Sequence, residues 1–282
     1  MLRSMYAGIS GMRGFQTKLD VVGNNIANVN TAGYKKSRIT FQDLMSQTEQ
    51  GAQGPEGGRG GINPRQVGLG AQVGSIDTVD TQGFLQPTGR ALDIAIEGDG
   101  FFRVGEVDSD NPSEASNTFY TRAGNFYLDE EGYVVTADGY YLLQHDENGN
   151  YPDGDDGVRI KIDPENTQSF SIGKNGTVNI VDSSGDLQSD QRISLAIFAN
   201  PEGMEKMGTN LYVPSTNSGE PTEGHPGDDG FGDFAAGSLE MSNVDLAEEF
   251  TEMITAQRAF QANTRIITTS DEILQELVNL KR

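Results

Sequence analysis

The sequence contains no cysteine, so disulfide bonds and thiolate metal sites are excluded. Histidine is nearly absent as well. Only His145 and His225 occur, 80 positions apart in acidic loops, where solvated side chains are expected. We find no Gly-x-Ser-x-Gly nucleophile elbow, no phosphate-binding loop and no complete dinucleotide fingerprint. The sequence therefore predicts no enzyme, no cofactor and no dedicated metal site.

Long apolar runs are also absent. No stretch approaches the roughly 18 apolar residues of a membrane span, and the first ten residues lack the apolar core of a cleaved secretory signal. There are 42 acidic residues against 20 basic ones, and the formal net charge of -22 argues against nucleic acid or an anionic membrane as a partner. If the protein leaves the cytoplasm, we expect it to use another export route.

One acidic segment begins like a calcium-binding loop at Asp146. Tyr151 stands where such a loop needs Gly, and Gly157 stands where it needs Glu, so an EF-hand is excluded. Looser cation binding stays open for three neighbouring carboxylates, those of Asp153, Asp155 and Asp156.

The chain is organised around residues 244–282, its longest stretch without Gly or Pro. Every seventh residue is apolar in the row Leu246, Met253, Phe260, Ile267 and Leu274. A second row, three positions further on, is small or polar at four of its five positions: Glu249, Ala256, Asn263, Ser270 and Leu277. With Asp245 as its N-cap, the pattern predicts one helix of about ten turns that needs a partner along its length. The alternative is an ordinary amphipathic helix on a globular core.

A second heptad pattern begins the chain. Its two rows contain Leu2 and Ile9, and Met5, Met12, Leu19 and Ile26. Four glycines interrupt it, at positions 8, 11, 14 and 23, and each costs about 1 kcal/mol of helix propensity relative to Ala. We interpret them as small faces that let other helices approach closely; the alternative is a mere weakness of the helix.

The two ends of the chain carry opposite net charges. Residues 1–38 carry six basic residues and one acidic residue, whereas residues 245–282 carry four basic and seven acidic residues. These opposite net charges predict an antiparallel pair of terminal helices, a coiled-coil-like stem. Independently solvated helix faces remain the alternative, because exposed ion pairs contribute little.

The middle of the chain favours short strands, since 36 glycines amount to about one residue in eight. Alternating or apolar runs predict strands at residues 92–96, 101–102, 119–128, 133–136, 140–144, 169–172, 178–181 and 193–198. Residues 45–74, rich in Gly and Gln, predict a long loop or an extended hairpin. The fold class is α+β, with a helical stem (1–34 and 242–282), an extended linker (35–75) and an antiparallel barrel or sandwich (76–241).

Three segments carry a family resemblance: GNNIANVNTAGYKKS at residues 23–37, TGRALDIAIEGDGFFRV at residues 88–104, and residues 244–282. Together they resemble the bacterial flagellar rod and hook proteins. Six residues of the first segment carry the family signature, namely Asn24, Asn25, Asn28, Thr31, Gly33 and Tyr34.

The resemblance implies a structural subunit that is exported unfolded by the flagellar type III apparatus and polymerises outside the cell. The second and third segments look more like the hook, a curved tube that joins rod to filament and transmits torque as a universal joint. The implied partners are further copies of the chain, the distal rod protein, the hook cap protein and the hook-filament junction proteins. The alternative within the family is the distal rod, a straight drive shaft. A calcium-dependent or carbohydrate-binding β domain with helical oligomerisation ends is the alternative from another class.

We expect the assembly interface to combine the family-signature residues with apolar residues of both terminal helices. The apolar members are Leu2, Met5, Ile9, Met12 and Leu19 from the first helix, and Met253, Phe260, Ile267, Leu274 and Leu277 from the last. Each of them could also be core of a two-helix stem, and both roles are compatible because a lone helix pair leaves one flank of each helix exposed.

Overall fold

The computed structural model describes residues 2–55, 60–107, 115–144, 158–164, 166–228 and 230–280. His145 and the carboxylates of Asp153, Asp155 and Asp156 lie outside the described residues. The chain divides into two compact units. Unit 1 contains Met1–Ala27, Ser37–Val79 and Val244–Arg282, and unit 2 contains Asn28–Lys36 and Asp80–Asn243.

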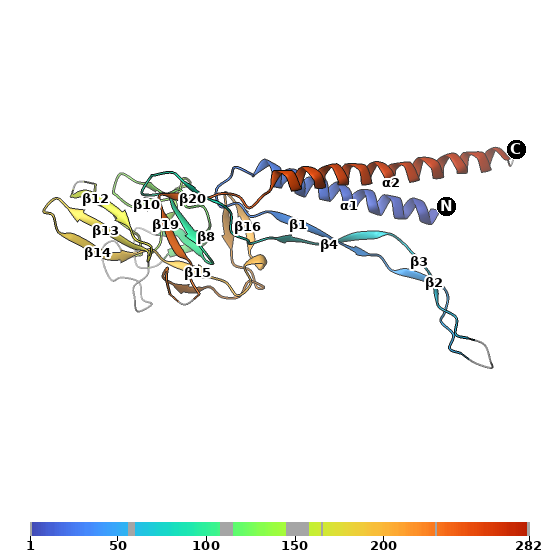
Figure 1. Cartoon of the computed structure of the whole chain (residues 1–282), viewed down its shortest axis with the longest axis horizontal. Coiled ribbons are helices and arrows are strands. Elements are labelled where there is room, and N and C mark those ends of the chain that lie inside the picture. Colours follow the sequence, from blue (N-terminus) through green and yellow to red (C-terminus); the bar gives the residue numbers. More distant parts are fainter. Residues whose placement is uncertain are drawn as a thin grey trace. The chain divides into compact units, whose positions relative to one another are not determined.

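Unit 1 contains the two long helices, α1 (Leu2–Ala27) and α2 (Leu246–Leu280) (Figure 1). The predicted single C-terminal helix is therefore confirmed. Asp245 caps it, because its Oδ1 accepts hydrogen bonds from the backbone N–H of Ala247 at 2.8 Å and of Glu248 at 3.4 Å. Neither helix, over its described residues, has the length and apolarity needed to cross a membrane.

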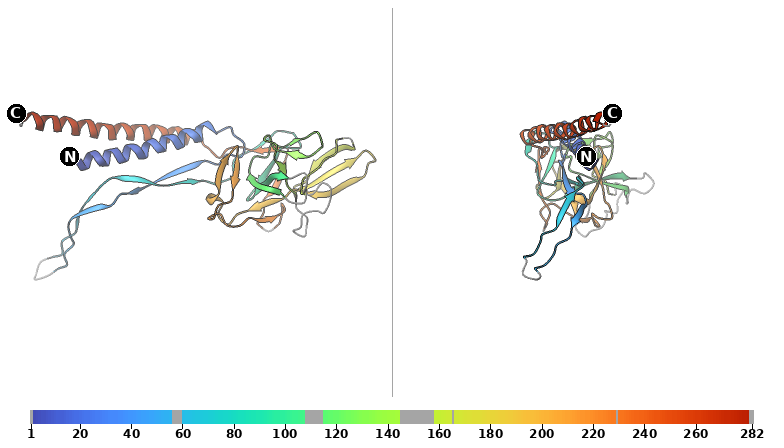
Figure 2. Two further views of the ribbon diagram at one scale, coloured as in Figure 1. Left: turned by 180° about the vertical axis from the view of Figure 1, so that it is seen from behind. Right: turned by 90° about the vertical axis from the view of Figure 1, so that its right-hand side faces the viewer.

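Unit 1 also contains a two-stranded antiparallel ribbon (Figure 2). At its base β1 (Ser37–Asp43) pairs with β4 (Ala71–Thr78), and further out β2 (Ser46–Gln50) pairs with β3 (Arg65–Gly68). A hydrogen bond from the N–H of Leu44 to the carbonyl of Gly70 joins the two pairs at 2.9 Å. The described residues 45–55 and 60–74 therefore belong to an extended antiparallel ribbon, which favours the predicted extended hairpin over a long loop.

Over its described residues, unit 2 is built on one antiparallel sheet of nine strands. In spatial order its path is β16 (Glu205–Gly208), β17 (Leu211–Val213), β8 (Ala115–Thr121), β7 (Phe101–Val107), β11 (Tyr141–Leu142), β10 (Val134–Val135) and β9 (Tyr127–Leu128). Off this path, β15 (Leu195–Ile197) pairs with β7 and with β18 (Thr222–Gly224).

Smaller elements complete unit 2. A three-stranded sheet contains β12 (Thr167–Ile172), β13 (Thr177–Asp182) and β14 (Leu187–Arg192), and two further pairs join β19 (Asp233–Ala236) to β6 (Ile94–Glu97) and β20 (Ser238–Glu240) to β5 (Leu85–Pro87). A short 3-10 helix covers Pro201–Gly203. The hairpin predicted at Lys174-Asn175-Gly176 connects β12 to β13, and Gly176 adopts a φ of 77° there.

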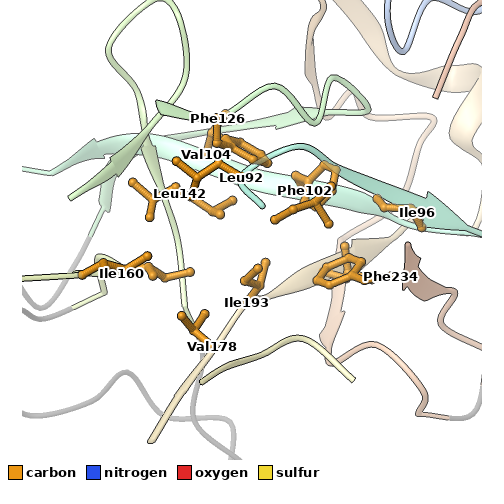
Figure 3. Packing of buried hydrophobic residues seen from close by; sticks show 14 of the residues in the cluster. Leu92, Ile96, Phe102, Val104, Phe126, Leu142, Ile160, Val178, Ile193 and Phe234 are labelled. Atoms are coloured by element: carbon orange, nitrogen blue, oxygen red, sulfur yellow. The ribbon is translucent and has the colours of Figure 1, made fainter. Parts of the chain in front are cut away.

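Strand β7 supplies both sides of the unit 2 core, because successive side chains of a strand point to opposite faces. Phe102 is fully buried beside Phe126 and Phe234, at ring-centroid distances of 5.2 and 5.4 Å. Figure 3 shows these rings in one cluster with the aliphatic side chains around them. Phe101 packs instead in a second cluster with Tyr120, Ala196, Phe198, Met204 and Tyr212.

The structure confirms an antiparallel β domain but corrects two expectations about it. The barrel form is wrong, because the path of the main sheet, as far as it is described, ends at β16 and β9 without closing. The expectation of a solvated His225 is also wrong. Its side chain is buried, and its backbone N–H donates to Oδ2 of Asp228 at 3.2 Å.

We predict that Phe102→Ala lowers the free energy of unfolding of unit 2 by about 3 to 5 kcal/mol, because it removes a fully buried ring and leaves a cavity. Urea denaturation followed by tyrosine fluorescence measures this in the full chain, since every tyrosine except Tyr6 lies in the sequence of unit 2. The control is Phe84→Ala, whose ring is 88% exposed and whose loss should cost no more than about 0.5 kcal/mol. Equal losses for the two variants would contradict the assigned core.

Candidate assembly interface

The two helices of unit 1 pack against each other in antiparallel orientation. Along α1 the contacts run from Gly8 to Asn25, and their partners on α2 run backwards from Ile267 to Glu249. Between these ends, the Thr264 hydroxyl donates to Sδ of Met12 at 3.4 Å and Lys18 pairs with Glu252 at 3.2 Å. The predicted antiparallel pair is confirmed.

The small and polar row of α2 is its most buried row. Glu249, Ala256 and Ser270 are buried, and Asn263 is half-buried. The apolar row flanks this seam: Met253, Phe260, Ile267 and Leu274 are half-buried, and Leu246 is 40% exposed. Leu277, the last member of the small and polar row, is 48% exposed. On α1, Met5, Ile9, Met12 and Leu19 are half-buried, while the side chain of Leu2 lies outside the described residues. The predicted assembly residues thus contribute to the stem and also keep apolar surface exposed.

Two of the α1 glycines let α2 approach closely. A Cβ added at Gly8 would stand 3.4 Å from the Ile267 side chain, and one at Gly11 would stand 2.8 Å from the Asn263 amide. Gly14 instead faces the Phe41 ring of β1, and a Cβ at Gly23 would meet no described atom within 4 Å. The close-approach interpretation is therefore confirmed for Gly8 and Gly11 and stays a prediction for Gly14 and Gly23.

Asn25 connects three segments of unit 1. Its side chain is buried and bridges the backbone of Ser37 in both directions, accepting from N–H at 3.0 Å and donating to the carbonyl at 2.9 Å. Nδ2 also donates to the buried Glu249 carboxylate at 3.2 Å. An amide suits this position because it offers a donor and an acceptor side by side. The family-signature residue Asn25 thereby holds α1, β1 and α2 together.

The next signature residues form a turn at the start of unit 2. Thr31 donates from its backbone N–H to the carbonyl of Asn28 and from its hydroxyl to the Asn28 Oδ1, both at 3.1 Å. These two residues line a polar cavity of about 410 Å³ together with Asn125, Asp138 and Asn210. The remaining asparagine of the signature, Asn24, is exposed on α1.

Gly33 occupies a position that no other residue fits. Its φ is 69°, in the left-handed region, and its N–H donates to the carbonyl of Glu240 at 2.8 Å. A Cβ here would stand 2.6 Å from the backbone of Arg122 and Ala123. Tyr34 follows as a buried residue, with the Lys206 ammonium 5.2 Å from its ring centroid.

A buried cluster of four charges lies beside Gly33. Lys35 Nζ contacts Oε1 of Glu240 at 2.8 Å and Oδ1 of Asp80 at 3.5 Å, and it donates to the Thr81 carbonyl at 2.8 Å. Arg122 approaches the other Glu240 oxygen at 3.4 Å. Lys35, Arg122 and Glu240 are each no more than 3% exposed. Two positive and two negative groups therefore compensate one another; three of them are almost completely buried, and the fourth, Asp80, is 16% exposed.

A charge of this cluster also affects the pKa of Tyr212. Burial, and then the negative charge of Asp80, raise the pKa of the Tyr212 hydroxyl well above its ordinary value. The sequence did not indicate the cluster, because Lys35 and Glu240 are 205 positions apart. The only available signal was the position of Lys35 directly after the signature residues Gly33 and Tyr34.

An apolar groove lies between α1 and the ribbon of unit 1. It encloses about 620 Å³, and its apolar lining includes Tyr6, Ile9, Leu44, Leu69 and Val73. Two basic side chains, Arg3 and Arg13, also line it. The sequence alone did not indicate this groove, since its two walls come from segments about 60 positions apart whose pairing was not predicted.

We predict that Gly33→Ala destabilises unit 2 by about 3 kcal/mol or more, since the new methyl group combines a left-handed backbone with a clash against Arg122 and Ala123. Gly89→Ala separates these two causes. Gly89 has a φ of 73°, yet a Cβ there would meet no described atom within 4 Å, so its loss should stay near 1 to 2 kcal/mol. Urea denaturation of both variants checks the difference, and equal losses would refute the close approach.

We also predict that Lys35→Met lowers the unfolding free energy by about 3 to 5 kcal/mol, because it leaves the buried Glu240 carboxylate and the partly buried Asp80 carboxylate short of one cation. Lys174→Met, at an exposed lysine of the same unit, should change it by no more than about 0.5 kcal/mol. Thermal and urea unfolding at neutral pH measure both. A Lys35→Met variant as stable as the control would show that Lys35 does not compensate the carboxylates.

Comparison with known proteins identifies the family to which these features belong. The profile described as "Flagella basal body rod protein" matches residues 5–35, "Flagellar hook protein FlgE/F/G D1 domain" matches residues 95–180, and "Flagellar basal body rod FlgEFG protein C-terminal" matches residues 235–280.

Individual relatives cover the whole chain. The flagellar basal-body rod protein FlgG of Bacillus subtilis is 56% identical over 283 residues, and the flagellar hook protein FlgE of Borreliella burgdorferi is 30% identical over 449 residues; each comparison covers 100% of both chains. Among solved structures, the flagellar hook protein FlgE2 of Helicobacter pylori is 14% identical, with a TM-score of 0.24 over 64% of this chain and 47% of that one. By its full-length sequence relatives, this chain belongs to the family of flagellar rod and hook proteins, which are structural components of the bacterial flagellum and its basal body.

Proposed function

We propose that this chain is the subunit of the distal rod, the straight drive shaft of the flagellar basal body. The observation that carries the proposal is the full-length match to FlgG, which is 56% identical and needs only 283 aligned positions for the 282 residues of this chain. The match to the hook protein FlgE runs over 449 positions, so at least 167 of them face a gap in this chain. Both length and identity thus favour the rod.

The sequence features that pointed to the hook do not separate the two proteins. The C-terminal profile is described for FlgEFG together, and the profile over residues 95–180 is described for FlgE/F/G. Since rod and hook proteins share both segments, these segments indicate the family and not its member. The hook remains the second candidate, supported by the 30% identity to FlgE over the full length of both chains.

The proposed mechanism is mechanical. A drive shaft transmits torque only if its subunits resist deformation, and each unit of this chain contains a buried polar anchor that fixes segments far apart in sequence. In unit 1 the anchor is Asn25 with Ser37 and Glu249, and in unit 2 it is Lys35 with Glu240. Breaking either anchor would leave buried polar groups unpaired, which is costly in a medium of low dielectric constant. Both units should therefore deform little under load.

We further propose that the apolar residues left half-exposed on α1 and α2 are covered by neighbouring copies in the polymer. These include Met5 and Met12 on α1, and Phe260 and Leu277 on α2. On this proposal residues 1–34 and 242–282 form the stem of the tube, residues 35–75 form the linker and residues 76–241 form the outer domain. The partners are further copies of the chain and, at the far end of the rod, the hook. The subunit reaches this place through the flagellar type III apparatus.

Deleting the gene in its own bacterium tests the proposal. We expect basal bodies that end in truncated rods and carry no hook, because the hook has no distal rod on which to be built. Electron microscopy of isolated basal bodies measures rod length directly. Complete rods without hooks would overturn the distal-rod assignment in favour of the hook.

Two controls make the result specific. Expression of the intact chain in the deletion strain must restore full-length rods, which excludes an effect on neighbouring genes. Antibody labelling of the restored structures should then mark the rod and leave the hook unlabelled. Label along the hook would contradict the proposal even if the rods of the deletion strain were short.

A further inference from the structure

One lysine and two carboxylates meet within the buried charge cluster of unit 2. Lys35 Nζ donates to Oε1 of Glu240 and to the carbonyl of Thr81, both at 2.8 Å, and Oδ1 of Asp80 lies 3.5 Å away. The Lys35 and Glu240 side chains are 3% and 1% exposed. Because an ammonium group has three N–H donors, one of them is left for Asp80. An amine, a carboxyl group and a second carboxylate are thus held within reach of one another.

The two carboxylates differ in how well they are satisfied. Oδ1 of Asp80 is buried and accepts no hydrogen bond from any described residue, since 3.5 Å is longer than an ordinary N–H···O bond. Glu240, in contrast, accepts at Oε1 from Lys35 and from the backbone N–H of Gly83, and its Oε2 faces Arg122 at 3.4 Å. Glu240 is therefore held in place by several donors, whereas Asp80 keeps a buried oxygen that faces the amine without bonding to it.

Lys35 and Asp80 lie where the chain leaves unit 2 and where it returns. Lys35 is two residues before Ser37, the first residue of β1, and Asp80 is two residues after Thr78, the last residue of β4. Ser37 and Thr78 are paired in the antiparallel ladder. A covalent bond between Lys35 and Asp80 would therefore close the whole ribbon segment into a loop at its two ends.

We propose that Lys35 and Asp80 condense to an isopeptide bond, with Glu240 as the general base. The new bond joins Nζ of Lys35 to Cγ of Asp80, and the C–O bond of one carboxyl oxygen breaks. An ammonium group and a carboxylate thereby become one neutral amide and one water molecule. The reaction oxidises and reduces nothing, so it needs no cofactor and no co-reactant. It also does not depend on the distal-rod assignment.

The protons can be followed through the reaction. The N–H of Lys35 that faces Asp80 passes its proton to the carboxylate, which leaves an uncharged amine beside a carboxylic acid. The lone pair of Nζ then attacks Cγ. Glu240, 2.8 Å from Nζ, takes a second proton from the nitrogen and delivers it to the departing hydroxyl, which leaves as water. Glu240 ends as it began, and the nitrogen retains one hydrogen.

Burial and proximity both favour the product. Charges are costly in surroundings of low dielectric constant, and the condensation converts two of the four charges of the cluster into a neutral amide. Reacting groups held in the right geometry reach effective molarities of up to about 10⁸ M, which opposes hydrolysis of the amide. Since Lys35 and Glu240 are 205 positions apart, the reaction can begin only after unit 2 has folded. The 16% exposure of Asp80 gives the released water a way out.

Mass spectrometry of the purified full-length chain tests the proposal. After incubation of the folded protein at neutral pH, the denatured chain should be lighter than its sequence mass by one water molecule. Trypsin does not cut after an acylated lysine, so the digest should contain residues 19–36 joined to residues 66–90. Fragmentation of this branched peptide locates the bond. A chain of full mass that yields the linear peptide ending at Lys35 would overturn the proposal, as would a loss of water without the branched peptide.

Three variants separate the bond from the ion pair. Lys35→Arg keeps the positive charge but has no primary amine, and Asp80→Ala has no carboxyl group, so both should have the full mass. Glu240→Gln retains the two reacting groups and should slow bond formation by about a hundredfold or more after refolding, because the general base is lost. Circular dichroism verifies that this variant folds. A folded Glu240→Gln chain that forms the bond at the wild-type rate would contradict the role of Glu240.

The chain also contains an internal control. Lys161 Nζ and Oδ1 of Asp163 are 3.6 Å apart, nearly the same distance, but their side chains are 28% and 52% exposed. Water stabilises the separate charges of this pair, so its tryptic peptides should be unmodified. A bond at Lys161 as well would show that distance alone suffices, and the assignment of the reaction to the buried cluster would fail.

Discussion

The ion pair between Lys35 and Glu240 is the constraint on which unit 2 depends. It joins the short segment 28–36 to the strand that precedes α2, across 205 positions of sequence, and both side chains are almost completely buried. Arg122 and the N–H of Gly83 share the same carboxylate. An ion pair in such surroundings contributes less net stability than its short distance suggests, but it excludes arrangements in which any one charge lacks its partner. The ion pair therefore determines which segments of unit 2 come into contact, more than it adds to the stability of their packing.

Unit 1 is held together by contacts of another kind than those of unit 2. Its helices meet through small and polar residues, with Gly8 and Gly11 on one side and Ala256 and Ser270 on the other, so the two backbones approach closely and little apolar side chain is enclosed. The larger apolar residues are displaced to the flanks of the seam. A pair of helices built in this way is poorly stabilised alone and well suited to gain stability from neighbours. The close seam and the exposed apolar flanks of the stem thus result from the same packing.

The sequence analysis located helices and strands whose burial leaves a periodic pattern, and it missed contacts between segments that are far apart in the chain. The heptad rows located α2 to within two residues at each end, and alternation located β6 and β13, because burial on one face leaves a regular pattern. Strand β14 was missed, since Leu187–Arg192 is polar and mostly exposed, and so gives no such pattern. The order of the strands, and with it the absence of barrel closure, depends on pairings that no local pattern encodes. The signature residues were found by resemblance, but nothing in the sequence singled out Lys35, Arg122 and Glu240 as partners.

The division of the chain between its units has a consequence for the order of folding. The polypeptide passes from one unit to the other four times, at positions 27–28, 36–37, 79–80 and 243–244. Unit 2 completes its charge cluster only when Glu240 arrives, and unit 1 completes its stem only when α2 arrives. Contacts of such high sequence separation form late and slowly. A chain that emerges from its N-terminus first therefore completes neither unit until its last forty or so residues are free.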